Sequence, residues 1–171
     1  MTVDRLVLRP LRPSDEAAFR RAHAVMAGED FAFGLFYDDG MPFGRYVERM
    51  ERERQGRDLE GSRVPHTFLV AEVDGEIVGR ASIRHELNEF LAAEGGHVGY
   101  GVLPGHRRRG YATEILRQCL RIARDVGLDR VLVTCDDDNA GSATVIERCG
   151  GVFDSFVVGH GGVRMRRYWI G

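Results

Sequence analysis

The chain predicts a mixed α/β protein in which one domain, residues 1–171, accounts for the whole sequence. Two local patterns lead to this fold class. Asp74-Gly75 lies between two strand-like runs, as this pair does in a two-residue hairpin turn, and the apolar residues from 112 to 126 form one helical stripe that ends at Gly127. The third observation is the order of elements, which reads strand, helix, helix, three strands, helix, strand, helix and two strands.

The first half of the chain supplies an edge strand and two helices. Pro10 lies in the strand over 6–11 and is tolerated only where no ladder donor is needed, so this strand belongs at a sheet edge. Ser14-Asp15-Glu16 offers a cap and first-turn acids for a helix that ends near residue 26. Residues 31–41 are aromatic and broken by glycine, which predicts a loop, and a second helix follows over 43–54.

The second half supplies the hairpin, four further strands and two helices. The expected strands cover 67–73, 76–83, 97–103, 131–135, 152–158 and 163–170. A polar stretch over 85–96 precedes the strand over 97–103. Gly99 and Gly101 interrupt this strand, and glycine inside a strand often marks a bulge or a close backbone approach. Asp138-Asn139 can cap the last helix, which Gly150-Gly151 stops.

Composition narrows the class of protein. The formal net charge is −2 and the pI is near 6.3, so bulk charge does not favour nucleic acid as a partner. Cys119, Cys135 and Cys149 fit neither zinc-site nor disulfide spacing, so we expect no metal and a reducing, cytoplasmic location. The sequence has no apolar signal segment and no run approaching the ~20 apolar residues that span a bilayer, so we expect no membrane partner.

Three consecutive arginines, Arg107 to Arg109, stand just before the long helix. A helix N-terminus carries about half a unit of positive charge from its peptide dipoles, so cations there are unfavourable unless an anion binds among them. Free backbone N–H groups at a glycine-bearing turn between a strand and a helix suit a phosphate or pyrophosphate. The sequence therefore predicts an anion site at this turn.

Two common phosphate motifs do not fit. The chain has no lysine, which excludes the Walker A motif, and Gly99-x-Gly101 is not followed by glycine three residues later, which excludes the dinucleotide fingerprint. What remains is R-x-x-G-x-A over 107–112, preceded by GYGVLP over 99–104.

This pattern resembles the acyl-CoA pyrophosphate loop, [QR]-x-x-G-x-[GA], of the GCN5-related N-acetyltransferases (GNAT). Residues 131–149, with D-x-x-N-x-x-S at 136–142, look like the strand and helix start that follow the loop in that family. The segments GHVGYGVLP, RRRGYATE and CDDDN are similar to those of a bacterial subgroup of predicted acetyltransferases. The resemblance covers nearly the whole chain and implies a central, mostly antiparallel, twisted sheet that is splayed at the cofactor site and flanked by about four helices.

The resemblance also implies acetyl-CoA as the cofactor. The residues that would contact it are Tyr100, Gly101, Val102, Leu103, Arg107, Arg108, Arg109, Gly110, Tyr111, Ala112, Thr113, Asn139 and Ser142. In the family the pantetheine arm pairs like an extra strand, which would place 100–103 along it, and the Asn139 amide would contact the same arm. Backbone N–H groups from 108 to 112 could bind the pyrophosphate, with glycine at 110 allowing a close approach.

Acyl transfer to an amine needs a base, because an ammonium group has no lone pair. His97 and Glu94 are the candidate general bases near the central strand. A strand N–H near Val102 or Leu103 could stabilise charge on the thioester oxygen. Many relatives have a tyrosine in the helix after the asparagine, but this chain reads V-I-E-R there, so the proton for the thiolate would come from water or from a tyrosine elsewhere, such as Tyr168.

The predicted function is acetyl transfer from acetyl-CoA to a primary amine, on a small molecule or a peptide, by direct attack in a ternary complex. Residues 31–43 are the predicted substrate wall, and Asp136-Asp137-Asp138 could attract a cationic amine or be a solvated turn. The alternatives are a non-catalytic acyl-CoA sensor and a nucleic-acid module that uses the basic cluster at 106–109. A monomer and a homodimer built on the closing hairpin both fit the sequence.

Overall fold

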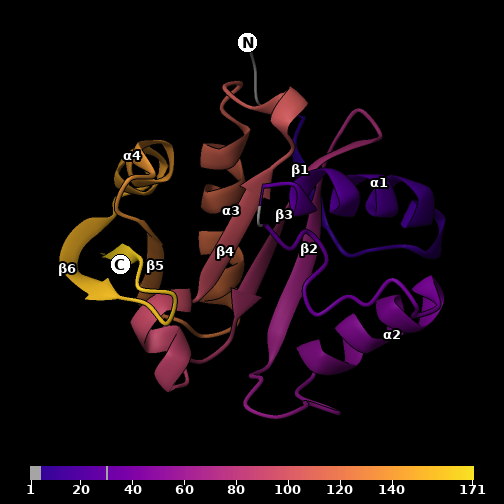
Figure 1. The fold of residues 1–171 in the computed structure, drawn as a ribbon, viewed down its shortest axis with the longest axis horizontal. Helices are drawn as coiled ribbons and strands as arrows, with labels where there is room; N and C mark the ends of the chain where they lie inside the picture. The colour runs from indigo at the N-terminus through magenta and orange to yellow at the C-terminus, as the bar shows by residue number, and fades with distance from the viewer. Residues whose placement is uncertain (1–4, 30) are drawn as a thin grey trace.

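The structure is a computed structural model that describes residues 5–29 and 31–171. It contains two antiparallel sheets (Figure 1). The first sheet has the order β1-β2-β3-β4 and comprises β1 (Val7–Arg9), β2 (His66–Val73), β3 (Glu76–Arg84) and β4 (Val98–Val102). The second has the order β5-β7-β6 and comprises β5 (Val131–Asp136), β7 (Arg164–Ile170) and β6 (Val152–Val158). The predicted sheet is therefore divided between β4 and β5, where the described residues form no ladder.

Four α-helices surround the sheets, as predicted (Figure 1). They are α1 (Glu16–Ala27), α2 (Phe43–Arg54), α3 (Tyr111–Asp125) and α4 (Ala140–Arg148). Alternate residues of β2 point to opposite faces of the first sheet. Phe68 and Val70 pack with the residues of α1 and α2, whereas Leu69 and Ala71 pack with those of α3. The first sheet is thus covered on both faces.

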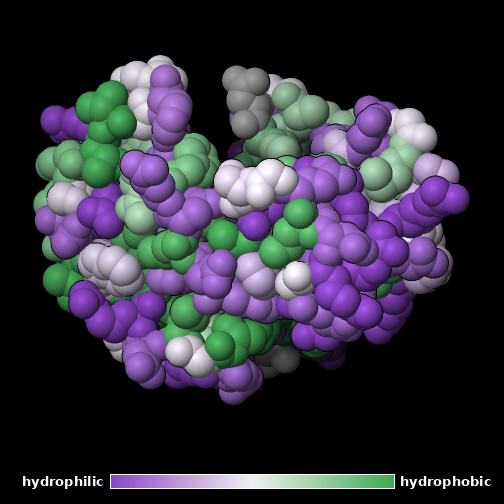
Figure 2. All heavy atoms as spheres, turned by 90° about the horizontal axis from the view of Figure 1, so that it is seen from below, coloured by the Kyte–Doolittle hydropathy of each residue, from purple (hydrophilic) through white to green (hydrophobic). Residues whose placement is uncertain are grey.

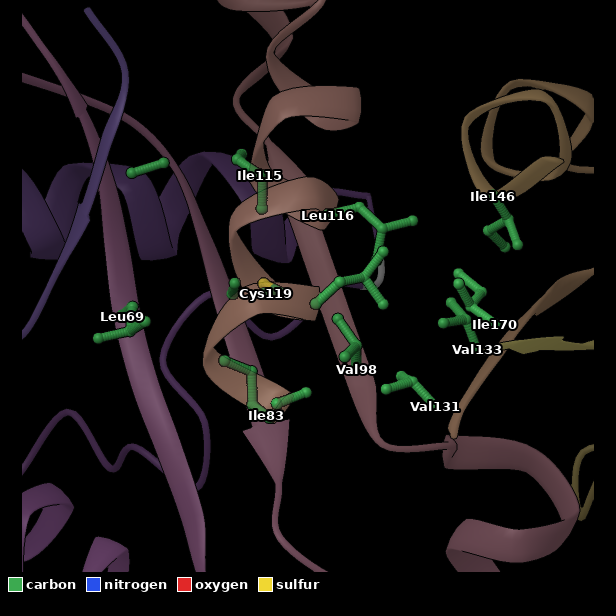
Figure 3. Close-up of a cluster of buried hydrophobic side chains, with 14 of the residues drawn as sticks. Leu69, Ile83, Val98, Ile115, Leu116, Cys119, Val131, Val133, Ile146 and Ile170 are labelled. Carbon is green, nitrogen blue, oxygen red and sulfur yellow. The ribbon is translucent and has the colours of Figure 1, made fainter. Parts of the chain in front are cut away.

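The larger core continues across the division between the sheets. Ile115, Leu116 and Cys119 of α3 are fully buried and pack with residues of both sheets. Figure 3 shows Leu116 pointing from α3 toward Val98 of the first sheet and toward the side chains of the second sheet. Because its buried side chains pack with both sheets, α3 joins them. Burial of each large aliphatic side chain contributes about 1.5–3 kcal/mol to this packing.

Most predicted elements agree with the structure within a residue or two. The Asp74-Gly75 turn has φ of 50° and 84°, as a type I′ hairpin requires. Two details differ. Asp15 does not cap α1 with its side chain, because its carboxylate binds Arg9 instead. The stretch over 85–96 includes a short π-helical turn at Leu91–Gly95, which its polar composition did not predict.

The surface is uneven in character. Figure 2 shows hydrophilic side chains gathered on the side of α2 and hydrophobic ones exposed on the side of β6. Within the described ranges, no helix is both long and apolar enough to cross a membrane.

Candidate active site

The strands β4 and β5 meet at one point and then diverge. At that point the His97 N–H donates to the Leu132 oxygen at 2.8 Å, and the Leu132 N–H donates to the His97 Nδ1 at 2.9 Å. Gly96 comes just before, with φ of 64°, and a Cβ there would lie 2.6 Å from the Leu132 oxygen. Only glycine fits such a position, so the sequence around 96–97 holds the closed end of the opening between the sheets.

Half of the β4 backbone faces this opening. The Arg84 N–H donates to the His97 oxygen at 2.7 Å, and the Leu103 N–H donates to the Val78 oxygen at 2.9 Å. Residues alternate in direction along an antiparallel strand, so the N–H groups of Tyr100 and Val102 point away from β3 and toward the opening. Of the two predicted charge-stabilising donors, Leu103 is therefore engaged in the sheet and Val102 faces the opening.

A cleft of about 260 Å³ occupies the opening. It brings together three predicted residues, Tyr100, Asn139 and Ser142. The Tyr100 hydroxyl lies 2.9 Å from the Ser142 Oγ, and the Asn139 Oδ1 accepts the Ser142 N–H at 3.0 Å, which caps α4. Burial raises the pKa of Tyr100, so its hydroxyl stays protonated at neutral pH.

The loop before α3 has the backbone of an anion site. Arg108 has φ of 60° and Gly110, at the N-cap of α3, has φ of 82°. No side chain of the described residues caps this helix, so its first N–H groups remain available at the positive end of the helix dipole. A pyrophosphate could accept hydrogen bonds from these N–H groups, so the loop fits the predicted cofactor.

The sequence predicted three crowded arginines without an anionic protein partner, but Arg107 has one. Its side chain forms an ion pair with Glu29, and its Nε donates to the Val102 oxygen at 3.0 Å. Arg108 and Arg109, by contrast, form no ion pair with any carboxylate among the described residues. The positive charge at the helix N-terminus is thus concentrated in Arg108 and Arg109, and Arg107 ties the loop to β4 and to the end of α1.

The two candidate bases lie beside the cleft and do not line it. His97 is 5% exposed, and burial together with the charge of Arg84 lowers its pKa. A neutral ring whose Nδ1 accepts a hydrogen bond carries its proton on Nε2, so this geometry leaves no free lone pair on the ring. Glu94 accepts the His160 N–H at 3.1 Å and also pairs with the His160 ring, which lowers the pKa of the carboxyl.

Other predicted groups lie outside the cleft or are occupied. The Tyr168 hydroxyl donates to the Glu147 Oε1 at 3.1 Å and its side chain is buried away from the cleft. Asp137 binds Arg164 and Arg166, at 2.7 and 2.6 Å, whereas Asp136 lines the cleft.

Phe31, Arg80 and Arg84 are among the side chains that line the cleft and that sequence reasoning did not assign to it individually. Phe31 belongs to the predicted substrate wall. Arg80 and Arg84 are four residues apart in a strand, which places both on one face, and this spacing was the available signal. His160 was missed because it is 66 residues from Glu94 in the sequence.

A divided antiparallel sheet that opens beside an uncapped helix N-terminus is the architecture expected of an acyl-CoA-dependent transferase. Residues 5–152 match the family model described as the acetyltransferase (GNAT) domain. The chain therefore belongs to the GNAT family and is an acetyltransferase enzyme. None of the curated proteins compared with the chain matches it.

Several solved acetyltransferases share the fold. The microcin C7 self-immunity acetyltransferase MccE, in complex with acetyl-CoA and AMP, is 14% identical with a TM-score of 0.71, over 98% of this chain and 92% of that one. An acetyltransferase from Agrobacterium tumefaciens strain C58 is 25% identical with a TM-score of 0.66 over the same shares. RimJ of Mycobacterium smegmatis, in complex with CoA-disulfide, is 22% identical with a TM-score of 0.67, over 96% of this chain and 81% of that one.

Proposed function

We propose that this acetyltransferase moves an acetyl group from acetyl-CoA to a primary amine by direct attack in a ternary complex. The observation that carries the proposal is the opening between β4 and β5, which is closed at His97, together with the uncapped N-terminus of α3, whose preceding loop is bound to the other end of β4 through Arg107 and the Val102 oxygen. The presence of acetyl-CoA in the similar MccE structure and of CoA-disulfide in the similar RimJ structure supports the choice of cofactor.

Different residues would bind different parts of the cofactor. The N–H groups of 108–112 and the side chains of Arg108 and Arg109 would hold the pyrophosphate, with Tyr111 and Thr113 in the first turn of α3. The N–H groups of Tyr100 and Val102 would pair with the pantetheine arm, as an added strand does at a sheet edge. When bound, acetyl-CoA supplies a thioester as the acyl donor.

The cleft residues would then serve the transfer. A β4 N–H that faces the opening would donate to the acyl oxygen and stabilise the negative charge that develops on it. The Tyr100 hydroxyl stays protonated and lies in the cleft, so it is our candidate proton donor to the departing thiolate, in place of the tyrosine missing from α4. A thiol has a pKa near 8.5, so this donor is helpful rather than essential.

Of the two candidate bases we favour Glu94, acting through water, and infer that His97 holds β4 to β5. Glu94 is adjacent to Gly95 of the cleft, and its carboxylate is ionised at neutral pH. We expect Glu94→Gln to lower kcat about 100-fold, the lower end of the usual effect of a general base, with little change in acetyl-CoA affinity. His97→Asn, which keeps an acceptor for the Leu132 N–H, should leave the pH–rate profile unchanged.

The measurement for this prediction is the pH dependence of kcat for the wild type and both variants. A His97→Asn enzyme that loses the acidic limb of the profile, beside a Glu94→Gln enzyme of normal turnover, would reverse the two assignments.

The proposed function itself is tested by acetyl-CoA binding and turnover. We expect acetyl-CoA to raise the melting temperature, and we expect free thiol to appear when an amine is added. Binding without thiol release across a broad amine panel would favour the sensor. Absence of binding, with salt-dependent binding of an oligonucleotide, would favour the nucleic-acid module.

We also propose that β6 forms a homodimer interface. It is an edge strand of the second sheet, and four of its apolar residues are exposed by 47–71%: Val152, Phe153, Phe156 and Val158. Exposed apolar edges favour association between chains. We expect the double variant Phe153→Asp, Phe156→Asp to be monomeric by light scattering, while Val7→Asp, which changes an exposed residue of β1 at an edge of the first sheet, stays dimeric. A monomeric wild type would contradict this proposal.

A further inference from the structure

Two arginines of β3 reach the cleft from the face of the first sheet that carries α1 and α2. Arg80 pairs with Val70 of β2, and Val70 packs with the residues of α1 and α2. Directly paired residues share a face of the sheet, and so do residues two and four positions apart. Both Arg80 and Arg84 line the cleft, on the face opposite α3.

Among the described residues, Arg80 is a buried cation without a counter-ion. It is 5% exposed, and its side chain donates to the Ala32 oxygen at 2.7 Å, with the Ser82 Oγ at a marginal 3.5 Å; within the same residues its Nε has no partner. No carboxylate in 5–29 or 31–171 pairs with it, whereas the buried Arg9 pairs with two. An uncompensated buried charge is costly, so this site favours an anionic ligand.

Arg84 and Phe31 complete the surroundings of Arg80. The Arg80 guanidinium lies 4.4 Å from the Phe31 ring centroid. The two glycines of β4 make room for them: a Cβ at Gly101 would lie 2.6 Å from the Phe31 ring, and one at Gly99 would lie 3.1 Å from the Arg84 Nη1. In the part of the chain described, the Arg84 side chain has one hydrogen-bond partner, the Gly95 oxygen at 3.3 Å.

The two guanidinium groups also disfavour each other. Burial lowers the pKa of Arg80 to about 9, with a further contribution from the charge of Arg84, and burial lowers the pKa of Arg84 to about 10. Both remain protonated at pH 7, so two positive charges face one cleft. A bound anion would relieve this repulsion, and guanidinium groups bind carboxylates and phosphates through paired hydrogen bonds.

We propose that the acceptor carries, besides its amine, an anionic group, a carboxylate or a phosphate, that binds Arg80 and Arg84. This inference rests on the proposed function and names the substrate class of the same cleft. Asp136 lines the cleft from β5, so the cationic amine has an acidic neighbour on the other side of the opening. The acceptor is therefore zwitterionic, with the anionic group directed to β3.

The test compares matched acceptors at saturating acetyl-CoA, by thiol release. Glycine is compared with glycinamide for the carboxylate, and 2-aminoethyl phosphate with ethanolamine for the phosphate. We expect the anionic member of one pair to have a kcat/KM higher by about 100-fold, because a site built for a charged group discriminates against its neutral analogue. The pair that shows the preference identifies the anion.

The variants assign the preference to the arginines. Arg80→Met and Arg84→Met should each remove most of it by raising KM for the anionic acceptor, with acetyl-CoA affinity unchanged within about twofold. Arg45→Met, at an exposed position of α2, is the control and should keep the preference. Replacing an uncompensated buried charge with an apolar side chain is neutral or stabilising, so Arg80→Met without acceptor should melt no lower than the wild type.

A binding measurement needs no turnover. The acetylated product of the preferred pair, N-acetylglycine for a carboxylate or N-acetyl-2-aminoethyl phosphate for a phosphate, should raise the melting temperature of the wild type more than its neutral counterpart does, and the Arg80→Met, Arg84→Met double variant should lose this difference. Equal kcat/KM within both pairs, with acetyl-CoA binding intact, would overturn the anionic acceptor and leave the proposed function standing. Failure of the wild type to bind acetyl-CoA would overturn both.

Discussion

Gly110→Glu is expected to remove the stabilisation of the protein by acetyl-CoA. Gly110 has φ of 82° at the N-cap of α3, a conformation that costs a residue with a Cβ about 1–2 kcal/mol. The new carboxylate would also stand where the loop should receive a pyrophosphate. A ligand at 100 times its Kd stabilises by about 2.7 kcal/mol, and a 100-fold weaker affinity leaves about 0.4 kcal/mol. The change in melting temperature on adding acetyl-CoA measures this loss.

The control separates backbone strain from loss of the site. Gly150 follows α4 with φ of 90° and has no atom within 4 Å of a Cβ built on it, so Gly150→Glu adds the same side chain to the same kind of backbone away from the loop. We expect Gly150→Glu to lower the melting temperature and yet keep the full response to acetyl-CoA. A full response in Gly110→Glu would show that the pyrophosphate binds elsewhere.

The backbone of the loop before α3 could be predicted because its determinants are contiguous. The turn, the glycine and the start of α3 all lie within 105–116, and the apolar stripe of α3 fixes which face of the helix is buried. The Asp74-Gly75 hairpin was predictable for the same reason, since turn chemistry is local. Such signals depend on residues close in sequence, so they can be recognised without knowledge of the tertiary structure.

The side of the cleft proposed for the acceptor could not be predicted in the same way, because it is assembled from distant segments. Arg80 reads in sequence as an ordinary strand residue, and only the packing of Phe31 and the absence of a described carboxylate partner make it unusual. His97 shows the same limit. Its position at a strand start was visible, but the hydrogen bond from Leu132 to its Nδ1 depends on where β5 approaches β4.

Arg9→Ala should cause the largest loss of stability among simple substitutions away from the cleft. Arg9 binds Asp15 through two hydrogen bonds, at 2.7 and 2.9 Å, and Glu72 through a third at 2.6 Å. The side chains of Arg9 and Asp15 are about nine-tenths buried. Removing one partner of a buried ion pair costs about 3–5 kcal/mol, which for a chain of this size lowers the melting temperature by about 10 °C.

Urea unfolding at neutral and acidic pH measures this effect and its cause. Burial raises the pKa of Asp15, but hydrogen bonds from Arg9 and Arg12 outweigh burial and lower it. A lowered carboxyl pKa stabilises the fold above the unfolded value of about 3.9, and this stabilisation is lost as the pH falls through the folded value. The difference between wild type and Arg9→Ala should therefore shrink below about pH 4.

Arg20→Ala is the matched control, because Arg20 pairs with Glu16 on the exposed side of α1 and such pairs contribute less than about 1 kcal/mol. Arg9 binds Asp15 at the start of α1, and Glu29, just after the end of α1, pairs with Arg107 of the loop before α3. The donors proposed for the pyrophosphate nevertheless belong to 108–112. Folded Arg9→Ala protein should therefore keep its acetyl-CoA affinity, and a parallel loss of affinity would show that α1, through Glu29, holds the loop in its binding conformation.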